Sequence, residues 1–252
     1  MRGLENKVVV VAGGAGGIGT ATSMRLAEEG CKVVVGDISD DAANVVSAIK
    51  EAGGEAIGCT VDISDDESVE ALVKTAIEAY GGVDLFHANA ADLSIIMSDT
   101  NALDIDLDIW DRTLRVNLRG FLLCTRHVIP QFLARGGGAI VYTSSAASFV
   151  GEPERPAYAA AKSGVNALMR HIASKYGKQH IRANAIAPGL IVSDRMREVM
   201  PPALLDGTLK GTRSWRLGDP TDIAGMVAFL LSDDGEWVNG QVISVDGGVT
   251  LR

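Results

Sequence analysis

The sequence predicts an α/β protein with a doubly wound sheet of about seven parallel strands and helices on both faces. Short β-branched runs alternate with longer amphipathic stretches, which is the pattern of repeated βα units. The first run leads into a glycine-rich turn and then a helical pattern. With 252 residues, 47% of them hydrophobic, the chain can close around one sheet, so we expect one domain over 1–252.

The expected elements follow from these patterns. The β-branched runs predict strands at 7–12, 32–37, 55–61, 83–89, 139–143, 182–187 and 241–245. Apolar residues at three- and four-residue spacing predict helices, which cover 18–29, 66–80, 109–133, 157–176 and 221–231.

Two stretches fit neither a strand nor a crossover helix. They are the Asp-rich stretch 92–108 and the stretch 190–216, which contains Pro201 and Pro202. Both follow strands on the side of the sheet where ligands bind. The stretch 92–108 is either a wall of the substrate site or a plain surface loop. We expect 190–216 to form a substrate lid, with Gly189 and Gly207 as hinges.

The charge and the cysteines argue against several classes of protein. The formal net charge of −9 repels phosphate backbones and anionic membrane surfaces, so neither nucleic acid nor membrane is an expected partner. The first apolar run is too short for a signal segment or a membrane span. Cys31, Cys59 and Cys124 are far apart and form no C-x-x-C pair. We therefore expect a cytoplasmic protein with reduced thiols and no metal site.

The turn after the first strand predicts a dinucleotide site of the Rossmann type. Gly13, Gly16, Gly17 and Gly19 surround Ile18 where the helical pattern begins. Glycine has no Cβ to block a close backbone approach. The helix N-terminus offers free N–H groups and partial positive charge to a pyrophosphate. A glycine turn placed between a strand and a helix therefore indicates nucleotide binding rather than simple packing.

Asp37 ends the second expected strand, eighteen residues after Gly19. An acid at this place accepts hydrogen bonds from the adenosine ribose hydroxyls and repels a 2′-phosphate. No basic residue stands at Ala15, Ile38 or Ser39 to receive that phosphate. NAD(H) is therefore expected in preference to NADP(H).

Two neighbouring acids have alternative roles. A helix N-cap is the other possible role of Asp37, and it suits Asp40 better. Asp62, after the third expected strand, either caps the next helix or reaches the adenine.

Tyr158 and Lys162 lie four residues apart among strong helix formers, so both project from one helix face. A phenol titrates near pH ~10, but a neighbouring ammonium and the positive nicotinamide ring of NAD⁺ lower its pKa. Tyr158 could then take a proton from an alcohol or return it. Ser144 and Ser145 end the expected strand 139–143. A hydroxyl there can hydrogen-bond the substrate oxygen, while the other caps the loop.

Together these residues resemble the short-chain dehydrogenase/reductase family, in its short single-domain branch, over essentially the whole chain. Gly13, Gly17 and Gly19 match the glycine motif of the family, and Tyr158 and Lys162 match its YxxxK motif.

The resemblance also assigns the remaining candidate residues. The family's serine lies thirteen residues before its tyrosine, which selects Ser145. The family's helix asparagine, which holds a water in the proton path, matches Asn117. The implied cofactor contacts are Pro188 and Gly189 beside the nicotinamide, the Ile191 backbone and Ser193 hydroxyl near its carboxamide, Asp62 with Ile63 by the adenine, Asn89 with Ala90 along the ribose, and Ile38.

The chain departs from the family pattern at three positions. Ala12 replaces the usual Thr before the glycine turn, Ala91 replaces the Gly that closes the asparagine motif, and Ser193 replaces the usual Thr. These changes affect the cofactor site and remove no catalytic group.

The resemblance implies hydride transfer between NAD(H) and a secondary alcohol or ketone. The expected substrate contacts are Ser145, Tyr158, Ala147 and Leu190, with Phe149, Met196 and Met200 as further candidates. These candidates are mostly apolar, which favours a neutral alicyclic, aryl or steroid-like alcohol. Met196 and Met200 could equally form the core side of a small helix.

Two alternative functions stay open. One is a 3-oxoacyl-thioester (acyl-carrier-protein) reductase. Such enzymes usually take NADPH and dock an acidic carrier, so Asp37 and the net charge of −9 argue against it, although Arg126 and Arg170 could form a basic patch. The other is a non-catalytic NAD-binding scaffold or sensor. Related enzymes are usually homotetramers, and the apolar stretches 167–172 and 241–251 could supply such contacts.

Overall fold

Seven parallel strands form one sheet in the order β3-β2-β1-β4-β5-β6-β7. The structure, a computed structural model, describes residues 1–251, apart from the side chains of Asp194, Arg195 and Val199. The strands are β1 (Val8–Ala12), β2 (Lys32–Asp37), β3 (Glu55–Thr60), β4 (Leu85–Ala88), β5 (Gly138–Thr143), β6 (Ile181–Pro188) and β7 (Val242–Val245). The predicted doubly wound α/β fold is confirmed.

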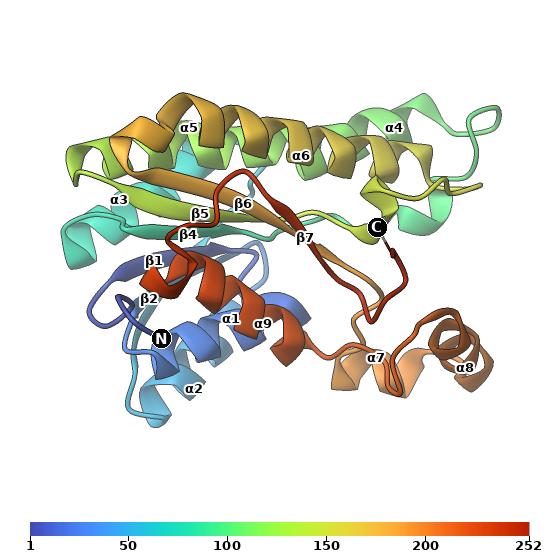
Figure 1. Cartoon of the computed structure of the whole chain (residues 1–252), viewed down its shortest axis with the longest axis horizontal. Helices are drawn as coiled ribbons and strands as arrows, with labels where there is room; N and C mark the ends of the chain where they lie inside the picture. Colours follow the sequence, from blue (N-terminus) through green and yellow to red (C-terminus); the bar gives the residue numbers. More distant parts are fainter. Residues whose placement is uncertain (252) are drawn as a thin grey trace.

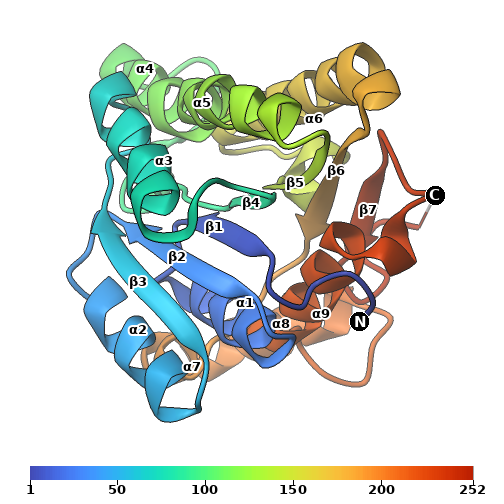
Figure 2. The same ribbon diagram turned by 90° about the vertical axis from the view of Figure 1, so that its left-hand side faces the viewer.

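Helices cover both faces of this sheet (Figures 1 and 2). On one face lie α1 (Gly17–Glu28), α2 (Ala42–Glu51) and α9 (Pro220–Leu231). On the other lie α3 (Asp66–Tyr80), α4 (Leu107–Leu114), α5 (Gly120–Ala134) and α6 (Pro156–Tyr176). Two further helices, α7 (Asp194–Val199) and α8 (Pro202–Gly211), stand away from these layers at one end of the sheet, on the lower right of Figure 1.

Strand β1 shows why the central strands have nearly continuous apolar sequences. Val8 and Val10 pack into the core beneath α3, α5 and α6. Val9 and Val11 pack into the core beneath α1, α2 and α9. Since neither face meets water, both sets of alternating side chains must be apolar.

The structure corrects several expected elements. Helix α2 was not expected, although Val45, Val46 and Ile49 give it a buried face. The helix expected at 109–133 is instead α4 and α5 joined by a π-helical turn at Arg115–Arg119. The expected lid 190–216 contains α7 and α8. The stretch 92–108 is irregular apart from a 3₁₀ turn at Ile96–Ser98 and the start of α4.

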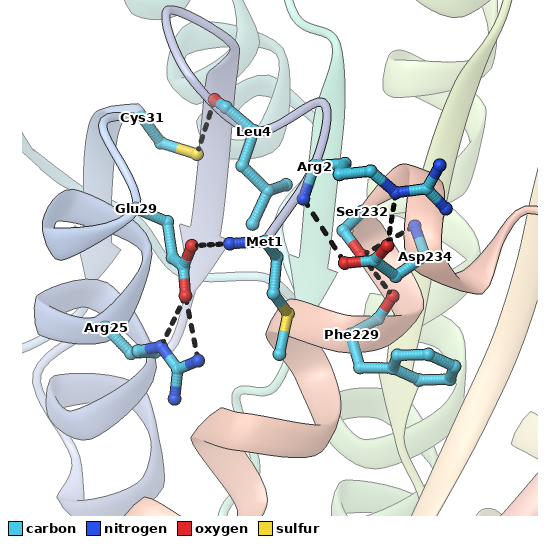
Figure 3. Close-up of polar contacts among 9 residues, drawn as sticks. All are labelled: Met1, Arg2, Leu4, Arg25, Glu29, Cys31, Phe229, Ser232 and Asp234. Atoms are coloured by element: carbon cyan, nitrogen blue, oxygen red, sulfur yellow. Dashed lines mark hydrogen bonds and ion pairs between the residues drawn. The ribbon is translucent and has the colours of Figure 1, made fainter.

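Polar contacts of the chain start join α1 to the end of α9 (Figure 3). The Met1 amino group pairs with Glu29, just after α1, and Glu29 also accepts hydrogen bonds from Arg25. Arg2 pairs with Asp234 beyond α9, with 2.6 Å between Nε and Oδ1. These contacts help to fix α1, whose N-terminus opens at the opposite end, toward the glycine turn.

Candidate active site

The carboxyl ends of four central strands bring the candidate residues to one edge of the sheet. The strand order reverses between β1 and β4, and in doubly wound sheets the ligand crevice lies at such a switch point. The glycine turn follows β1 and Asn89 follows β4. Ser145 follows β5, and Gly189 follows β6.

The glycine turn has a closed inner side and an open outer side. Gly13 has a φ of +82°, and a Cβ there would lie 2.5 Å from the Ala90 backbone. A Cβ on Gly19 would lie 1.8 Å from the Gly13 carbonyl oxygen. At Gly16, the N-cap of α1, a Cβ would meet nothing within 4 Å. The helix N-terminus is therefore exposed where a pyrophosphate would need its N–H groups.

The half-buried Asp37 lies beside this turn at the end of β2. Its carboxylate accepts hydrogen bonds from the backbone N–H of Ala15 at 2.9 Å and of Ser39 at 3.0 Å. The carboxylate thus ties the glycine turn to the next strand and stands at its outer rim, beside the exposed Ile38. Neither Asp37 nor Asp40 is the N-cap of α2, which is Asp41 and makes no side-chain cap bond.

Asp62 does not cap the helix that follows it. The N-cap of α3 is Asp65, whose carboxylate accepts the Glu67 N–H. Asp62 instead accepts the Ser64 N–H at 2.8 Å. The neighbouring Ile63 is buried against Gly120, so its side chain supports the core.

Asn89 and Ala90 join β4 to the glycine turn. Both backbone N–H groups donate to the Ala12 carbonyl oxygen. The Asn89 side-chain Nδ2 donates to the Gly13 carbonyl oxygen at 2.8 Å. Asn89, just after β4, therefore supports the glycine turn by hydrogen bonding.

Tyr158, Ser145 and Lys162 converge at the end of β5, as expected. The Ser145 hydroxyl lies close enough to the Tyr158 phenol to lower its pKa, and it accepts the Ala147 N–H at 3.2 Å. Lys162 is buried, and its Nζ lies 5.7 Å from the Tyr158 ring centroid. The neighbouring Ser144 turns inward and donates to the Lys162 carbonyl oxygen.

Burial is the main cause of the pKa shifts of Lys162 and Tyr158. It lowers the pKa of Lys162 to about 7 and raises the pKa of Tyr158. The Ser145 hydroxyl and the Arg155 charge lower the pKa of Tyr158 in part, while Glu152 raises it. The net direction is opposite to the lowering expected from Lys162, because desolvation of the phenolate outweighs these contacts.

Asn117 lies in the π-helical turn between α4 and α5 and is fully buried. Its Oδ1 accepts the Asp92 N–H at 2.8 Å. The π turn adds a residue to the helical repeat at this point, and such turns occur frequently at functional sites.

The segment after β6 closes the other side of the crevice. A Cβ at Gly17 would lie 3.2 Å from Ser193 Cβ, so this segment lies over the glycine turn. Ser193 caps α7 by accepting the Met196 N–H. Ile191 forms an isolated bridge with Gly218.

The remaining candidate residues lie at different places around the crevice. Ala147 is buried at the end of β5. Leu190 lines a cavity of about 380 Å³ between β7 and the base of the 190–216 segment. Pro188 is the last residue of β6, and Gly189 packs against Asp246.

Sequence reasoning missed a buried hydrogen-bond chain behind the site. His87 Nε2 lies 2.9 Å from Thr143 Oγ1, which donates to Asn89 Oδ1 at 2.9 Å. Because Thr143 uses its proton on Asn89, His87 must donate from Nε2. A histidine within the apolar run of β4 was the available signal. The chain orients the Asn89 amide toward Gly13.

Sequence reasoning also missed a charged pair at the mouth of the site. Arg155 pairs with Glu152 and acts electrostatically on Tyr158. Arg155 has a left-handed φ of 65°, a tertiary feature without a sequence signal.

Comparisons with known proteins show the family to which the chain belongs. A family model described as Enoyl-(Acyl carrier protein) reductase matches residues 13–250. A probable short-chain type dehydrogenase/reductase of Bradyrhizobium diazoefficiens is 42% identical over 246 residues, which cover 97% of this chain and 88% of that protein. The chain belongs to the short-chain dehydrogenase/reductase family.

Two further members of this family, each named for a reaction, are also similar to the chain. The cis-4-hydroxycyclohexanecarboxylate dehydrogenase of Sinomonas cyclohexanicum is 38% identical over 245 residues, covering 97% of this chain and 96% of that protein. A solved 7α-hydroxysteroid dehydrogenase, complexed with NADH and 7-oxo glycochenodeoxycholic acid, has a TM-score of 0.91 at 33% identity. The match covers 98% of this chain and 95% of that chain.

A nicotinamide dinucleotide fits the residues of this short-chain dehydrogenase/reductase. The turn leaves no room for a Cβ at Gly13 but is open at Gly16, which suits a pyrophosphate on the N-terminus of α1. Ala12, which replaces a usual Thr, is buried.

Among the described residues, no three His, Cys, Asp or Glu side chains are grouped to hold a metal ion. In residues 1–251, no helix is both long and apolar enough to cross a membrane.

Proposed function

We propose that this chain is an NAD(H)-dependent dehydrogenase of secondary alcohols, or in reverse a reductase of ketones. The observation that carries the proposal is the convergence of Ser145, Tyr158 and Lys162 at the carboxyl end of β5. A phenol held between a hydroxyl and an ammonium can exchange a proton with a substrate oxygen.

Each side chain has a distinct part in the proposed reaction. The dinucleotide, when bound, supplies the hydride acceptor or donor. Tyr158 takes the alcohol proton, or returns it to the ketone oxygen. Ser145 orients that oxygen by hydrogen bonding. Lys162 favours the phenolate through its charge and would bind the nicotinamide ribose, and Asn117 would hold a water that carries the proton to solvent.

Asp37 supports NAD(H) rather than NADP(H). Its carboxylate stands at the outer rim of the glycine turn, where it can accept hydrogen bonds from ribose hydroxyls and repel a 2′-phosphate. The proposed cofactor contacts are otherwise those expected from the sequence. They are Gly13, Gly16, Gly17, Ile18, Gly19, Ile38, Asp62, Ile63, Asn89, Ala90, Pro188, Gly189, Ile191 and Ser193.

The proposed substrate is an alicyclic, aryl or steroid-like alcohol that meets Ser145, Tyr158, Ala147 and Leu190. Two similar family members are named for a hydroxycyclohexane carboxylate and a hydroxysteroid, which supports the alicyclic class. The description of the matching family model keeps an acyl-carrier-protein reductase as the alternative. A preference for NADPH would favour that alternative.

The proposed organisation is a single cytoplasmic domain with residues 190–216 as the substrate lid, assembled as a homotetramer. Leu114, Leu118, Leu122 and Leu168 line one apolar surface depression on α4, α5 and α6. In 167–172, Met169 and Ile172 are buried in the core, so this depression replaces them as the proposed contact. In 241–251, Val249 and Leu251 are exposed.

A panel of secondary alcohols with NAD⁺ and NADP⁺ tests the proposal through the absorbance of the reduced cofactor. We expect turnover with at least one alicyclic alcohol and a preference for NAD⁺. Tyr158→Phe should still bind NADH, yet turnover should fall by roughly 10² or more. Unchanged turnover in Tyr158→Phe would contradict the proton role. Tight NADH binding without turnover of any alcohol or ketone would indicate a scaffold or sensor.

A further inference from the structure

Asp99, in the Asp-rich stretch 92–108, reaches the helix that carries Tyr158. It lies far from α6 in sequence and is only 2% exposed. Its Oδ2 accepts the Tyr158 backbone N–H at 2.8 Å, and its Oδ1 accepts the Ala157 N–H at 3.2 Å. One buried carboxylate therefore holds the residue that carries the phenol.

The start of α6 needs this outside acceptor. Its own N-cap residue, Arg155, has a left-handed backbone and makes no side-chain cap bond. Helix N-termini leave their first N–H groups without partners inside the helix. Asp99 supplies the missing acceptors from another segment, and its negative charge also suits the positive end of the helix dipole.

The backbone around Asp99 fixes the same turn. The Arg155 N–H donates to the carbonyl oxygens of Asp99 at 3.0 Å and of Thr100 at 2.7 Å. These bonds hold the left-handed Arg155, so the last residue before α6 and the first turn of α6 are anchored to one short segment.

The same stretch also holds Asn117. The Asp92 N–H donates to Asn117 Oδ1 at 2.8 Å, and the Asp92 carboxylate accepts Arg112 Nε at 2.8 Å. Residues 92–100 therefore connect two helices that carry candidate catalytic groups. A plain surface loop would not require a buried carboxylate directed at α6.

We propose that Asp99 is a positioning residue that sets the place of Tyr158 relative to Ser145 and Lys162. The proposal rests on the proposed dehydrogenase function. Displacement of a reacting group by about 1 Å can reduce a rate roughly 10²-fold, so fraying of the first turn of α6 reduces turnover. The Arg155–Glu152 pair before α6 acts on the phenol. Lys162 Nζ lies 5.7 Å from the Tyr158 ring centroid, and the Asp99 carboxylate contacts the Tyr158 backbone N–H.

Three variants test the proposal against the wild-type enzyme. Asp99→Ala leaves two N–H groups without their acceptor. Asp99→Asn keeps one carbonyl oxygen, and Asn caps helices nearly as well as Asp. Asp106→Ala is the matched control, because Asp106 caps α4 in the same stretch by accepting the Asp108 N–H. The readouts are kcat per NADH-binding site, the Kd for NADH, and the pH profile of kcat/KM for alcohol oxidation.

We expect Asp99→Ala to lower kcat at least tenfold while the Kd for NADH changes less than twofold. The acidic limb of its pH profile should move to lower pH, because fraying exposes to water a phenol whose pKa is raised mainly by burial. Asp99→Asn should fall between Asp99→Ala and wild type in both measures. Asp106→Ala should keep the wild-type kcat and pH profile.

The failures of the two proposals are distinguishable. Wild-type enzyme that binds NADH without turnover overturns the proposed function, and this inference with it. Wild-type turnover with an unchanged kcat and pH profile in Asp99→Ala overturns the positioning role alone. If Asp99→Ala does not fold, a wild-type profile in Asp99→Asn overturns it as well.

Discussion

The Lys162 Nζ donates a hydrogen bond to the Thr143 carbonyl oxygen at 2.9 Å. Thr143 is the last residue of β5, and its side-chain hydroxyl bonds Asn89. Thr143 therefore contacts both Lys162, a candidate catalytic residue, and Asn89, which supports the glycine turn. A shift of β5 would move both halves of the proposed reaction site together.

Replacing Lys162 should lower activity and raise thermal stability. Its ammonium is buried and faces a carbonyl oxygen and the rings of Phe121 and Tyr158. Burying a charge that has no paired carboxylate is costly, which lowers the pKa of Lys162 to about 7, and an apolar chain of similar length avoids that cost. We expect Lys162→Met to lose turnover by roughly 10² or more while its thermal midpoint rises. Each kcal/mol gained raises Tm by about 2–4 °C in a chain of this size. A lower Tm in thermal unfolding would contradict this prediction.

Asp37 should control the choice of cofactor. Asp37→Ser removes the negative charge at the rim of the glycine turn but keeps a small hydrogen-bonding group. We expect the ratio of kcat/KM for NADPH to that for NADH to rise at least tenfold, measured by steady-state kinetics. Asp40→Ser removes an exposed acid three residues away and should leave the ratio unchanged. Equal ratios in both variants would show that Asp37 does not select the cofactor.

Gly13 should be intolerant of a side chain for two reasons that can be separated. Gly13 has a φ of +82°, and an added Cβ there clashes with Ala90. Gly53 has a similar φ of +86° but open space around it. Gly53→Ala should cost about 1–2 kcal/mol from the left-handed backbone alone. Gly13→Ala should cost more and should also weaken NADH binding. Urea unfolding of both variants measures the difference, and equal costs would remove the clash from the explanation.

His87 should make folding stability depend on pH. Burial lowers the pKa of His87 to about 3, whereas an unfolded histidine titrates near ~6.5. Because its pKa is lower in the folded state, the contribution of His87 to the free energy of unfolding is fully present above pH ~6.5. It is lost as the pH falls toward 3. We expect the wild-type free energy of unfolding to fall by up to roughly 1.4 kcal/mol per pH unit below 6.5 because of this residue.

The matched variants isolate the effect. His87→Val should flatten the dependence between pH 6.5 and 5, where few carboxylates titrate. His171→Gln, at an exposed position on α6, should leave the slope as in wild type. Chemical denaturation across this range is the measurement. A slope that survives in His87→Val would mean that other groups cause it.

Local patterns predicted most of the fold. The strand at 32–37 and the helix at 66–80 have the predicted ends, because their apolar spacing reports burial directly. Helix α2 was missed because its buried face is short and lies next to a run of acids. The break at Arg115–Arg119 was missed because a π turn keeps the helical pattern on both sides of it.

The residues of the candidate site were likewise predicted only in part. Tyr158 and Lys162 were proposed from their spacing on one helix face, whereas Ser145 and Asn117 were proposed only from the resemblance to the family. Asp99 and Thr143 were not identified, since one is an acid among several acids and the other ends an ordinary strand. Their roles depend on which groups other segments bring to them.

The sequence by itself determined the seven strands, the alternation of strands with helices, the glycine turn and the types of reactive side chain. Spacing along one chain segment is sufficient for these, because a helix or strand repeats locally. Only the tertiary structure decided that burial raises the pKa of Tyr158, that His87 supports Asn89 and that Asp99 caps α6. Burial and long-range hydrogen bonds arise when distant segments pack, so no local pattern reports them.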